Sequence, residues 1–374
     1  METQFAEQLR GYLRDERNPD VRKLREQALA HFESVGFPTP KQEDWKYTNV
    51  APLAKVPWMT PPLLKPAQSG KYGEILADYE FRRNGFTALN FAFAQFSPTI
   101  IPKGMEFHEP IKLEYGSGGG LMNSPHVVVI AEEGSKATII ESYSSSPNGF
   151  TNAVTRVIVG DNASVTHYRV QRDSTESYHI GTTEVSLSRD SRYDSTNINL
   201  GGALSRHDID LKFTAEGGEA FVDGLYMLDG TQHSDTHSVI DHMVPNCVSH
   251  QNYKGVLNGN SRGVFNGKVF VRENAHGTDA KQSNKNLLLS NDARVDTKPQ
   301  LEIFNDDVKC AHGATVGQLE EEELFYLLTR GLPPTLARNL LTYGFAEEII
   351  NKIQIEDIKR ELDAAVLNRL KAEI

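Results

Sequence analysis

The residues best suited to chemistry lie near the end of the chain, in the segment Asp306–Ala314. Cys310 and His312 are two positions apart, so on an extended strand both side chains point to the same side. A thiolate and an imidazole side by side suit iron, zinc or copper, but they make only half of a site. Completing the site requires a second chain, which favours an interface. A buried cysteine beside a hydrogen-bonded histidine would explain the same pair without a metal.

A second group of potential metal ligands lies earlier in the chain and comprises His233, His237, His242, Cys247 and His250. These residue types suit zinc. The spacing matches no compact site, because His233 and His237 share one face of a strand and His242 falls on the other. Cys247 stands where other repeats carry alanine, so the need for a small buried residue explains it. The sequence does not reveal a function for the histidines of this group.

No other motif in the sequence carries recognisable chemistry. It contains neither a GxxxxGK[ST] loop nor a GxSxG elbow, so we expect no ATP to be bound by this chain itself. Gly118–Gly120 has no strand–turn–helix context that would suit a phosphate. We therefore expect a protein that is not an enzyme.

The elements that position these residues fall into three regions, 1–123, 124–313 and 314–374. In the first region, apolar residues recur at helical intervals and stop at Gly36, which predicts helices. These residues are Phe5, Leu9, Leu13, Leu24, Ala28 and Phe32. The proline-rich stretch that follows contains Glu43–Thr48, which mixes aromatic and charged side chains. We interpret it as an anchor that docks the N-terminal segment onto the body, in preference to a ligand site.

The second region consists of short runs rich in Val, Ile, Thr and Tyr, separated by Gly, Asn and Asp, and this pattern predicts strands. A sandwich, a barrel or a solenoid would fit it. A repeat favours the solenoid, because turn signals recur at steps of 26 to 29 residues. The markers are Ala137, Ala163, Arg192, Ala220, Cys247 and Ala275. A shorter last step leads to Ala293, as expected for a terminal or a differently built rung.

In the third region the strand pattern gives way to three amphipathic helices. Gly331 ends the first of them, and Pro333–Pro334 begins the second. The third carries one apolar stripe from Ile355 to Leu370. The sequence thus predicts a helical subdomain appended to the β-rich core.

The composition restricts the classes of partner and the cellular compartment that we expect for this chain. The chain has 374 residues, with 39 basic and 50 acidic side chains and a formal net charge of -11, which argues against nucleic acid or an anionic membrane as a partner. No apolar run reaches the length of a membrane span, and Met1–Arg17 has the composition of neither a signal peptide nor a transit peptide. Two cysteines cannot form a disulfide framework, so we expect a cytoplasmic protein.

A long, ordered string of motifs supports a family assignment. It comprises residues 253–257, 262–268, 286–290, 296–303 and 307–317. This string resembles the SufB/SufD family of iron–sulfur cluster assembly proteins. Pro38–Val50 looks like the N-terminal signature of the SufD branch, and the short, cysteine-poor chain favours that branch over SufB. The resemblance implies a mainly β fold, with a right-handed parallel β-helix core flanked by N-terminal and C-terminal helical subdomains.

The resemblance also implies a role as the non-ATPase subunit of the Suf machine. The chain would pair with SufB through the ends of their β-helices. His312 matches the histidine of the family's cluster-assembly site and would face a SufB cysteine, and Cys310 matches a neighbouring family cysteine. The two chains would share a transient iron–sulfur cluster, or iron, at this interface. The sequence does not specify which type of cluster is built, which protein donates the sulfur, or whether a reduced flavin joins the complex.

The C-terminal helices match the family's docking region for the SufC ATPase. The residues expected to contact SufC are Leu324, Leu327, Leu328, Leu336, Leu340, Leu341 and Phe345. As a hypothesis, ATP binding would draw two SufC subunits together, and the attached helices would open the seam between SufB and its partner.

Three alternative interpretations fit the same sequence. A β-helix polysaccharide lyase would need a groove of convergent acidic or arginine side chains, and usually an exported chain. A zinc protein would be built on His233–His250. The third alternative keeps the family but pairs two copies of this chain, which would bring Cys310 and His312 together across a twofold axis.

Overall fold

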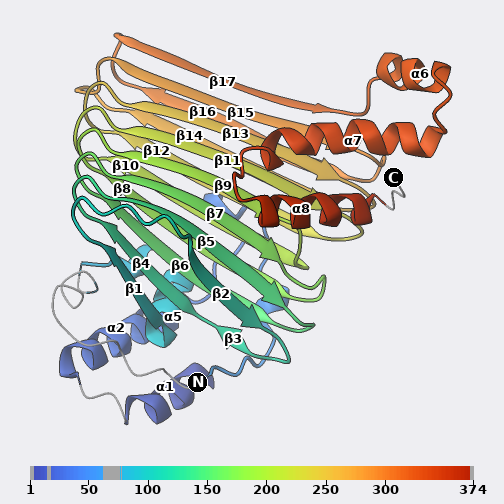
Figure 1. Cartoon of the computed structure of the whole chain (residues 1–374). Helices are drawn as coiled ribbons and strands as arrows, with labels where there is room; N and C mark the ends of the chain where they lie inside the picture. Colours follow the sequence, from blue (N-terminus) through green and yellow to red (C-terminus); the bar gives the residue numbers. More distant parts are fainter. Residues whose placement is uncertain (1–3, 15–17, 62–75, 77, 371–374) are drawn as a thin grey trace.

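The computed structural model describes residues 4–14, 18–61, 76 and 78–370. Its centre is a coil of strands that belong to two parallel sheets (Figure 1). The first sheet contains β1 (Gln95–Ile101), β3 (Met122–Asn123), β4 (Pro125–Ala131), β6 (Phe150–Val159), β8 (Tyr178–Leu187), β10 (Leu204–Phe213), β12 (His233–His242), β14 (Arg262–Val271) and β16 (Arg294–Ile303). The second sheet contains β2 (Ile111–Ser117), β5 (Lys136–Ser145), β7 (Ser164–Arg172), β9 (Arg192–Asn199), β11 (Glu219–Leu228), β13 (Val248–Leu257), β15 (Thr278–Leu288) and β17 (Val308–Gly317).

From β4 onward, consecutive strands lie in opposite sheets, so each turn of the chain adds one strand to each sheet. This arrangement is a parallel β-solenoid, and the predicted fold class is confirmed. The strands also extend beyond the range 124–313 expected for the core, since β1 to β3 precede it and β17 ends at Gly317. Strands β1 and β2 are half-buried, which leaves them without the strong apolar pattern of the inner strands.

The predicted period is confirmed as well. All six repeat markers lie within three residues of the first residue of a second-sheet strand. The prediction that Ala293 marks the next repeat is wrong. Ala293 precedes β16 of the first sheet, whereas the other markers lie at strands of the second sheet. The next strand of the second sheet begins at Val308, so the terminal rung keeps the ordinary length. A small residue marks any tight buried turn and does not say to which sheet the turn leads.

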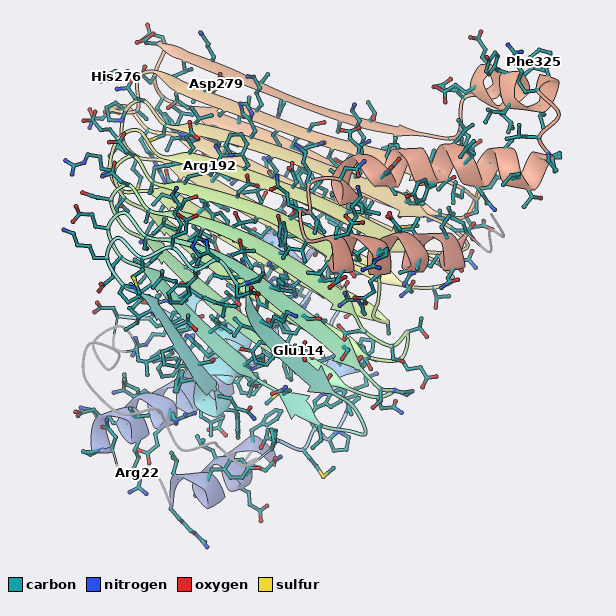
Figure 2. The ribbon with its side chains drawn as sticks, in the orientation of Figure 1. Arg22, Glu114, Arg192, His276, Asp279 and Phe325 are labelled. Atoms are coloured by element: carbon teal, nitrogen blue, oxygen red, sulfur yellow. The ribbon has the colours of Figure 1, made fainter. Side chains whose placement is uncertain are left out.

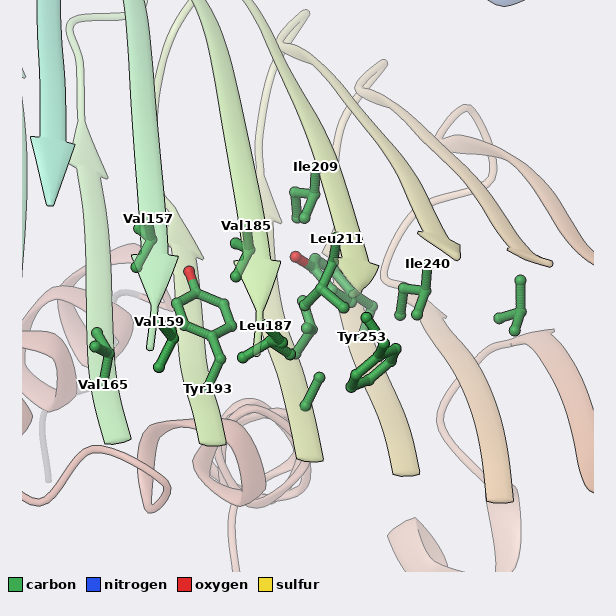
Figure 3. Close-up of a cluster of buried hydrophobic side chains, with 14 of the residues drawn as sticks. Val157, Val159, Val165, Val185, Leu187, Tyr193, Ile209, Leu211, Ile240 and Tyr253 are labelled. Carbon is green, nitrogen blue, oxygen red and sulfur yellow. The ribbon is translucent and has the colours of Figure 1, made fainter. Parts of the chain in front are cut away.

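A large part of the coil interior is filled by apolar side chains (Figure 3). Strand residues alternate between the interior and the outer face, and the parallel register stacks equivalent residues on successive rungs. One such column runs through Val129, Val157, Val185, Leu211, Ile240 and Val269. Full burial stabilises each of these side chains by about 1.5–3 kcal/mol, which every rung obtains only from its neighbours.

A helical layer covers the outer face of the first sheet (Figure 1). It comprises α1 (Gln4–Leu13), α2 (Pro19–Val35), η1 (Glu43–Trp45), α3 (Ala51–Ala54), η2 (Phe81–Arg83) and α5 (Gly85–Phe93). The side chain of Asn18 caps α2 at its start, and Gly36, with φ 66°, ends it. The helices predicted before Gly36 are confirmed.

The expected anchor between this layer and the solenoid is also present. Trp45 is buried, packs against Phe86, and lies over the Arg206 guanidinium at 3.8 Å. Thr48 Oγ1 donates a 2.5 Å hydrogen bond to Asp235 of β12. The segment therefore joins the N-terminal layer to the outer face of the first sheet.

Three C-terminal helices complete the fold: α6 (Glu321–Thr329), α7 (Pro334–Ile350) and α8 (Glu356–Arg369), as the sequence predicted. α7 and α8 lie against the second sheet, whereas α6 lies beyond the strand ends (Figure 1). The stripe of α8 buries Ile358, Leu362 and Val366. Among the described helices, none is long and apolar enough to cross a membrane.

Candidate functional site

Cys310 and His312 lie on β17, the last strand of the second sheet. The register pairs Cys310 with Ala280 and His312 with Gln282 of β15. Val308 and Cys310 are half-buried and pack against the apolar core, so this face of β17 points into the coil. His312 has the same parity and continues that face, but it is exposed. Both side chains thus lie on one side of the strand, at the mouth of the solenoid.

The terminal rung is much more exposed than the rungs below it. β14 and β15 bury alternate residues, whereas β17 buries none fully. Apolar side chains are exposed there, with exposed fractions of 41% for Ile303, 55% for Phe304 and 47% for Val316. Within the described chain, β16 and β17 each end their sheet, so one edge of each strand has no neighbouring strand. We call this end of the coil, formed by β16 and β17, the open end.

The local environment keeps the Cys310 side chain a thiol. Burial raises the pKa of this thiol, a hydrogen bond from the Ala280 backbone lowers it, and the negative charge of Asp279 raises it again. The net shift is upward, so little thiolate exists at neutral pH. A metal ion bound here would therefore displace a proton from sulfur.

Among the residues that the structure describes, Cys310 and His312 belong to no larger group of metal-ligating side chains. Within the part of the chain that the structure describes, no group of three or more His, Cys, Asp or Glu side chains is placed to hold a metal ion. A metal ion at the open end would therefore need ligands from another molecule.

The other histidine group is dispersed by the fold. His233 and His237 lie on the outer face of β12, where His233 contacts Thr48 Oγ1 at 2.9 Å and His237 contacts Asp235 at 3.1 Å. His242 is buried against Phe213. The two remaining members lie elsewhere: Cys247 is buried in the turn before β13, and His250 is on β13 in the other sheet. Within the described residues, these five side chains therefore form no cluster that could hold a zinc ion.

A buried polar network in the coil interior was not predicted. His167 Nε2 contacts Glu141 Oε2 at 2.9 Å, and its Nδ1 contacts the Tyr193 hydroxyl at 2.8 Å. Thr155 and Tyr143 both donate hydrogen bonds to Glu141 Oε1. The network therefore lies inside the coil and adjoins the apolar core, to which Tyr193 also belongs.

A second buried group adjoins this network. Arg169 lies over the Tyr143 ring and contacts His179 Nε2 at 2.6 Å, while His179 Nδ1 contacts Asp173 at 2.8 Å. Glu141, Arg169 and Asn197 are in register on successive rungs. The sequence does show a polar residue at this position in each of these repeats. Alternation along a strand, however, does not tell which face of the strand points into the coil.

The residues expected to dock SufC differ in exposure. Leu328 and Leu340 are exposed, and four others, Leu324, Leu327, Leu336 and Leu341, are half-buried. Phe345 packs against the body, with the Lys254 ammonium 4.4 Å from the centre of its ring. The most exposed large apolar residues of α6 were not among those expected: Phe325 is 68% exposed and Tyr326 56%. Figure 2 shows the position of Phe325 on α6. α6 buries no residue.

A two-sheet parallel coil with a thiol and an imidazole at an open end defines a β-solenoid scaffold. The family described as "SUF system FeS cluster assembly, SufBD core domain" matches residues 115–345, and "SufBD protein N-terminal region" matches residues 3–61. The chain belongs to the SufBD family of iron–sulfur cluster assembly proteins.

Named relatives point to the SufD branch of this family. The chain is 30% identical to the iron–sulfur cluster assembly protein SufD of Escherichia coli, with 92% of each chain covered. It is 29% identical to SufD of Bacillus subtilis over 76% of this chain and 67% of that protein. A SufBD family protein of Synechocystis is 39% identical over 75% of this chain, and the match spans 65% of that protein's length. The chain is a SufD-like protein of the SUF system.

Proposed function

We propose that this chain supplies one half of an iron–sulfur cluster assembly site, at the open end of its solenoid. The observation that carries the proposal is the position of Cys310 and His312 on the terminal strand, beside exposed apolar residues and an unpaired strand edge. The nascent cluster is the cargo of this site. The chain contributes the imidazole and half of the interface, and it catalyses no reaction on its own.

The partner at the open end is SufB. Exposed strand edges are usually covered, because their free N–H and C=O groups pair readily with another chain. Terminal repeats of a solenoid also need a polar outer face to stay soluble. The open end instead exposes the apolar side chains of Phe304 and Val316. A second solenoid that abuts β16 and β17 would cover both features. Its cysteine would supply the thiolate that completes the ligand set begun by His312.

Substitution of the histidine tests the assembly site. In cells that co-produce SufB and SufC, His312→Ala is expected to abolish cluster formation on the purified complex, measured by iron and sulfide content and by visible absorbance. His276 is an exposed histidine in the turn before β15, so His276→Ala serves as the matched control (Figure 2). A full cluster content in His312→Ala, with the complex intact, would remove His312 from the site.

SufC docks on the C-terminal helices. Phe325, Tyr326, Leu328 and Leu340 expose apolar surface on α6 and α7. α7 is also firmly attached to the coil: the Lys254 ammonium of β13 donates to the Phe345 carbonyl at 3.0 Å and forms an ion pair with Glu348. Strands β13, β15 and β17 are neighbours in that order. A force that ATP-driven SufC applies to α7 would thus reach the open end through two strand pairs.

Pull-down experiments test the docking surface. Leu340→Asp is expected to abolish retention of SufC, because it places a charge in the apolar contact. Met243, in the turn after β12, is similarly exposed, and Met243→Asp is expected to retain SufC fully. Equal retention by both variants would place the ATPase elsewhere.

The same open end would also allow self-pairing. Two copies that meet through β16 and β17 would form a twofold dimer in the absence of SufB. Sedimentation of the isolated chain distinguishes these states, and Val316→Asp, on β17, is expected to shift a dimer to monomer. A dimer that persists in this variant would use another surface.

A further inference from the structure

A chain of amide side chains leads through the interior of the coil toward His312. The Gln251 amide donates to Ser238 Oγ at 2.9 Å, and the Gln282 amide donates to Gln251 Oε1 at 2.8 Å. Gln251, Gln282 and His312 are in register on β13, β15 and β17. Each side chain is thus the next step of one column along the second sheet.

The last amide of this column ends in an unused acceptor. Gln282 is 3% exposed, and its Oε1 has no hydrogen-bond partner. A buried acceptor left unpaired costs about 1–3 kcal/mol, so the site is incomplete as it stands. Because Gln282 Nε2 is held by Gln251, the side chain cannot exchange its two ends without losing that bond. The oxygen is therefore left free to accept a hydrogen bond from another donor.

The fold reserves space for this glutamine. A Cβ atom built at Gly267, on the facing strand β14, would lie 2.3 Å from Gln282 Nε2 and 2.8 Å from its Cδ. Any residue other than glycine at position 267 would push the amide away. The Gln282 side chain thus extends across the interior against bare backbone. Such a fixed amide can orient a neighbour.

We propose that Gln282 is a positioning residue for His312. In the assembled site Gln282 Oε1 accepts a hydrogen bond from one ring N–H of His312, because neighbouring parallel strands lie only about 4.8 Å apart and both side chains point into the coil. This inference rests on the proposed role of His312 at the cluster site.

The hydrogen bond would select one tautomer of the neutral imidazole. A ring nitrogen that donates to Gln282 leaves the other nitrogen unprotonated, and only an unprotonated nitrogen can bind a metal ion. Second-shell acceptors fix histidine ligands in this way, and their loss typically weakens metal affinity about 10- to 100-fold. Gln282 would therefore present the lone pair of His312 toward the partner chain before any iron arrives.

The tautomer of the His312 ring can be measured directly. Nitrogen-15 NMR of histidine-labelled protein in complex with SufB, at a pH where the imidazole is neutral, is expected to show one His312 tautomer in the wild type. Gln282→Met keeps the chain length but removes the acceptor, and a mixture of tautomers like that of free imidazole is expected. Gln282→Glu restores an acceptor oxygen and is expected to restore the single tautomer. His312→Gln assigns the signal.

An unchanged His312 tautomer in Gln282→Met would overturn the inference. If that variant does not fold, Gln282→Leu lacks the same acceptor and gives the same comparison. Titration of the complex with Fe²⁺ alone is the second readout, and a 10- to 100-fold weaker affinity is expected for the variants without an acceptor. If His312→Ala leaves Fe²⁺ affinity and cluster content unchanged, the proposed function fails. If Gln282→Met leaves both quantities unchanged while His312→Ala lowers them, the positioning role of Gln282 is wrong and the proposed function of His312 is retained.

Discussion

Replacement of Glu141 by glutamine tests the buried polar network that shares the coil interior with the apolar columns. Glu141 is fully buried, and both of its oxygens accept hydrogen bonds or contact His167. Burial raises the pKa of Glu141. The hydrogen bond and charge of His167, followed by the charge of Arg169, outweigh burial and bring the pKa to about 2 from 4.5. The carboxylate is therefore held in its charged form by its neighbours.

The size of the effect follows from this shift. The fall in the pKa of Glu141 from 4.5 to about 2 corresponds to a contribution of about 3 kcal/mol to the free energy of unfolding. Because the pKa of the folded state is depressed, the contribution is complete above pH 4.5 and is lost as the pH falls through about 2. At neutral pH, Glu141→Gln is expected to cost about 3–5 kcal/mol, since it leaves the buried His167 without its partner.

Urea unfolding followed by circular dichroism at pH 7, 4.5 and 3 measures this contribution. The difference between wild type and Glu141→Gln is expected to be largest at pH 7 and to shrink steadily below pH 4.5. Glu133, an exposed partner of Lys103, provides the control, and Glu133→Gln is expected to leave the unfolding free energy nearly unchanged. A difference between wild type and Glu141→Gln that stays constant down to pH 3 would refute the reasoning.

Three further substitutions test other parts of the fold. Thr48→Val leaves Asp235 without a 2.5 Å hydrogen bond and is expected to cost about 1–3 kcal/mol; unchanged protease resistance of the N-terminal layer would contradict its role as an anchor. Gly224→Ala places a Cβ 2.1 Å from the Tyr253 ring and is expected to cost about 1–3 kcal/mol, visible as a lower melting temperature, whereas an equal or higher one would contradict the packing. Burial lowers the pKa of His242 to about 4, so its contribution is complete above pH 6.5 and falls toward pH 4. His242→Gln is expected to flatten the stability profile in that window, and an unaltered slope would show that His242 is not its cause.

The sequence was sufficient for the solenoid because stacking imposes a period. Each rung must place small residues at the same turns, so markers such as Ala163 and Cys247 recur whether or not the strands are recognised individually. The helix ends at Gly36 and Gly331 were readable for a similar local reason, since both adopt positive φ. Alternation likewise placed Cys310 and His312 on one side of a strand. These features depend on a few neighbouring residues.

The polar interior could not be predicted because polarity does not distinguish the two faces here. In an ordinary half-buried strand, polar residues face water, so Glu141 and His167 would be assigned outward. In this fold helices cover the outer face of each sheet, where Tyr168 and Val170 pack against α7 and α8. Only contacts between rungs, such as that of His167 with Glu141, show which residues turn inward. The hydrogen bond between Gln282 and Gln251 could not be predicted for the same reason, because it also joins two rungs inside the coil.

Pairing at the open end and protection of the cargo are physically the same event in the proposed complex. His312 is exposed because no further rung of the described chain follows β17, although the strands of the second sheet from β5 to β15 bury residues on the same face. A second solenoid that covers Ile303 and Phe304 would bury apolar surface and, without any change in this chain, enclose His312 as well. Separation of the two chains would expose both again. A motor that acts on α7 therefore need not move the histidine itself, because opening the seam is enough to admit iron and sulfide or to release the cluster.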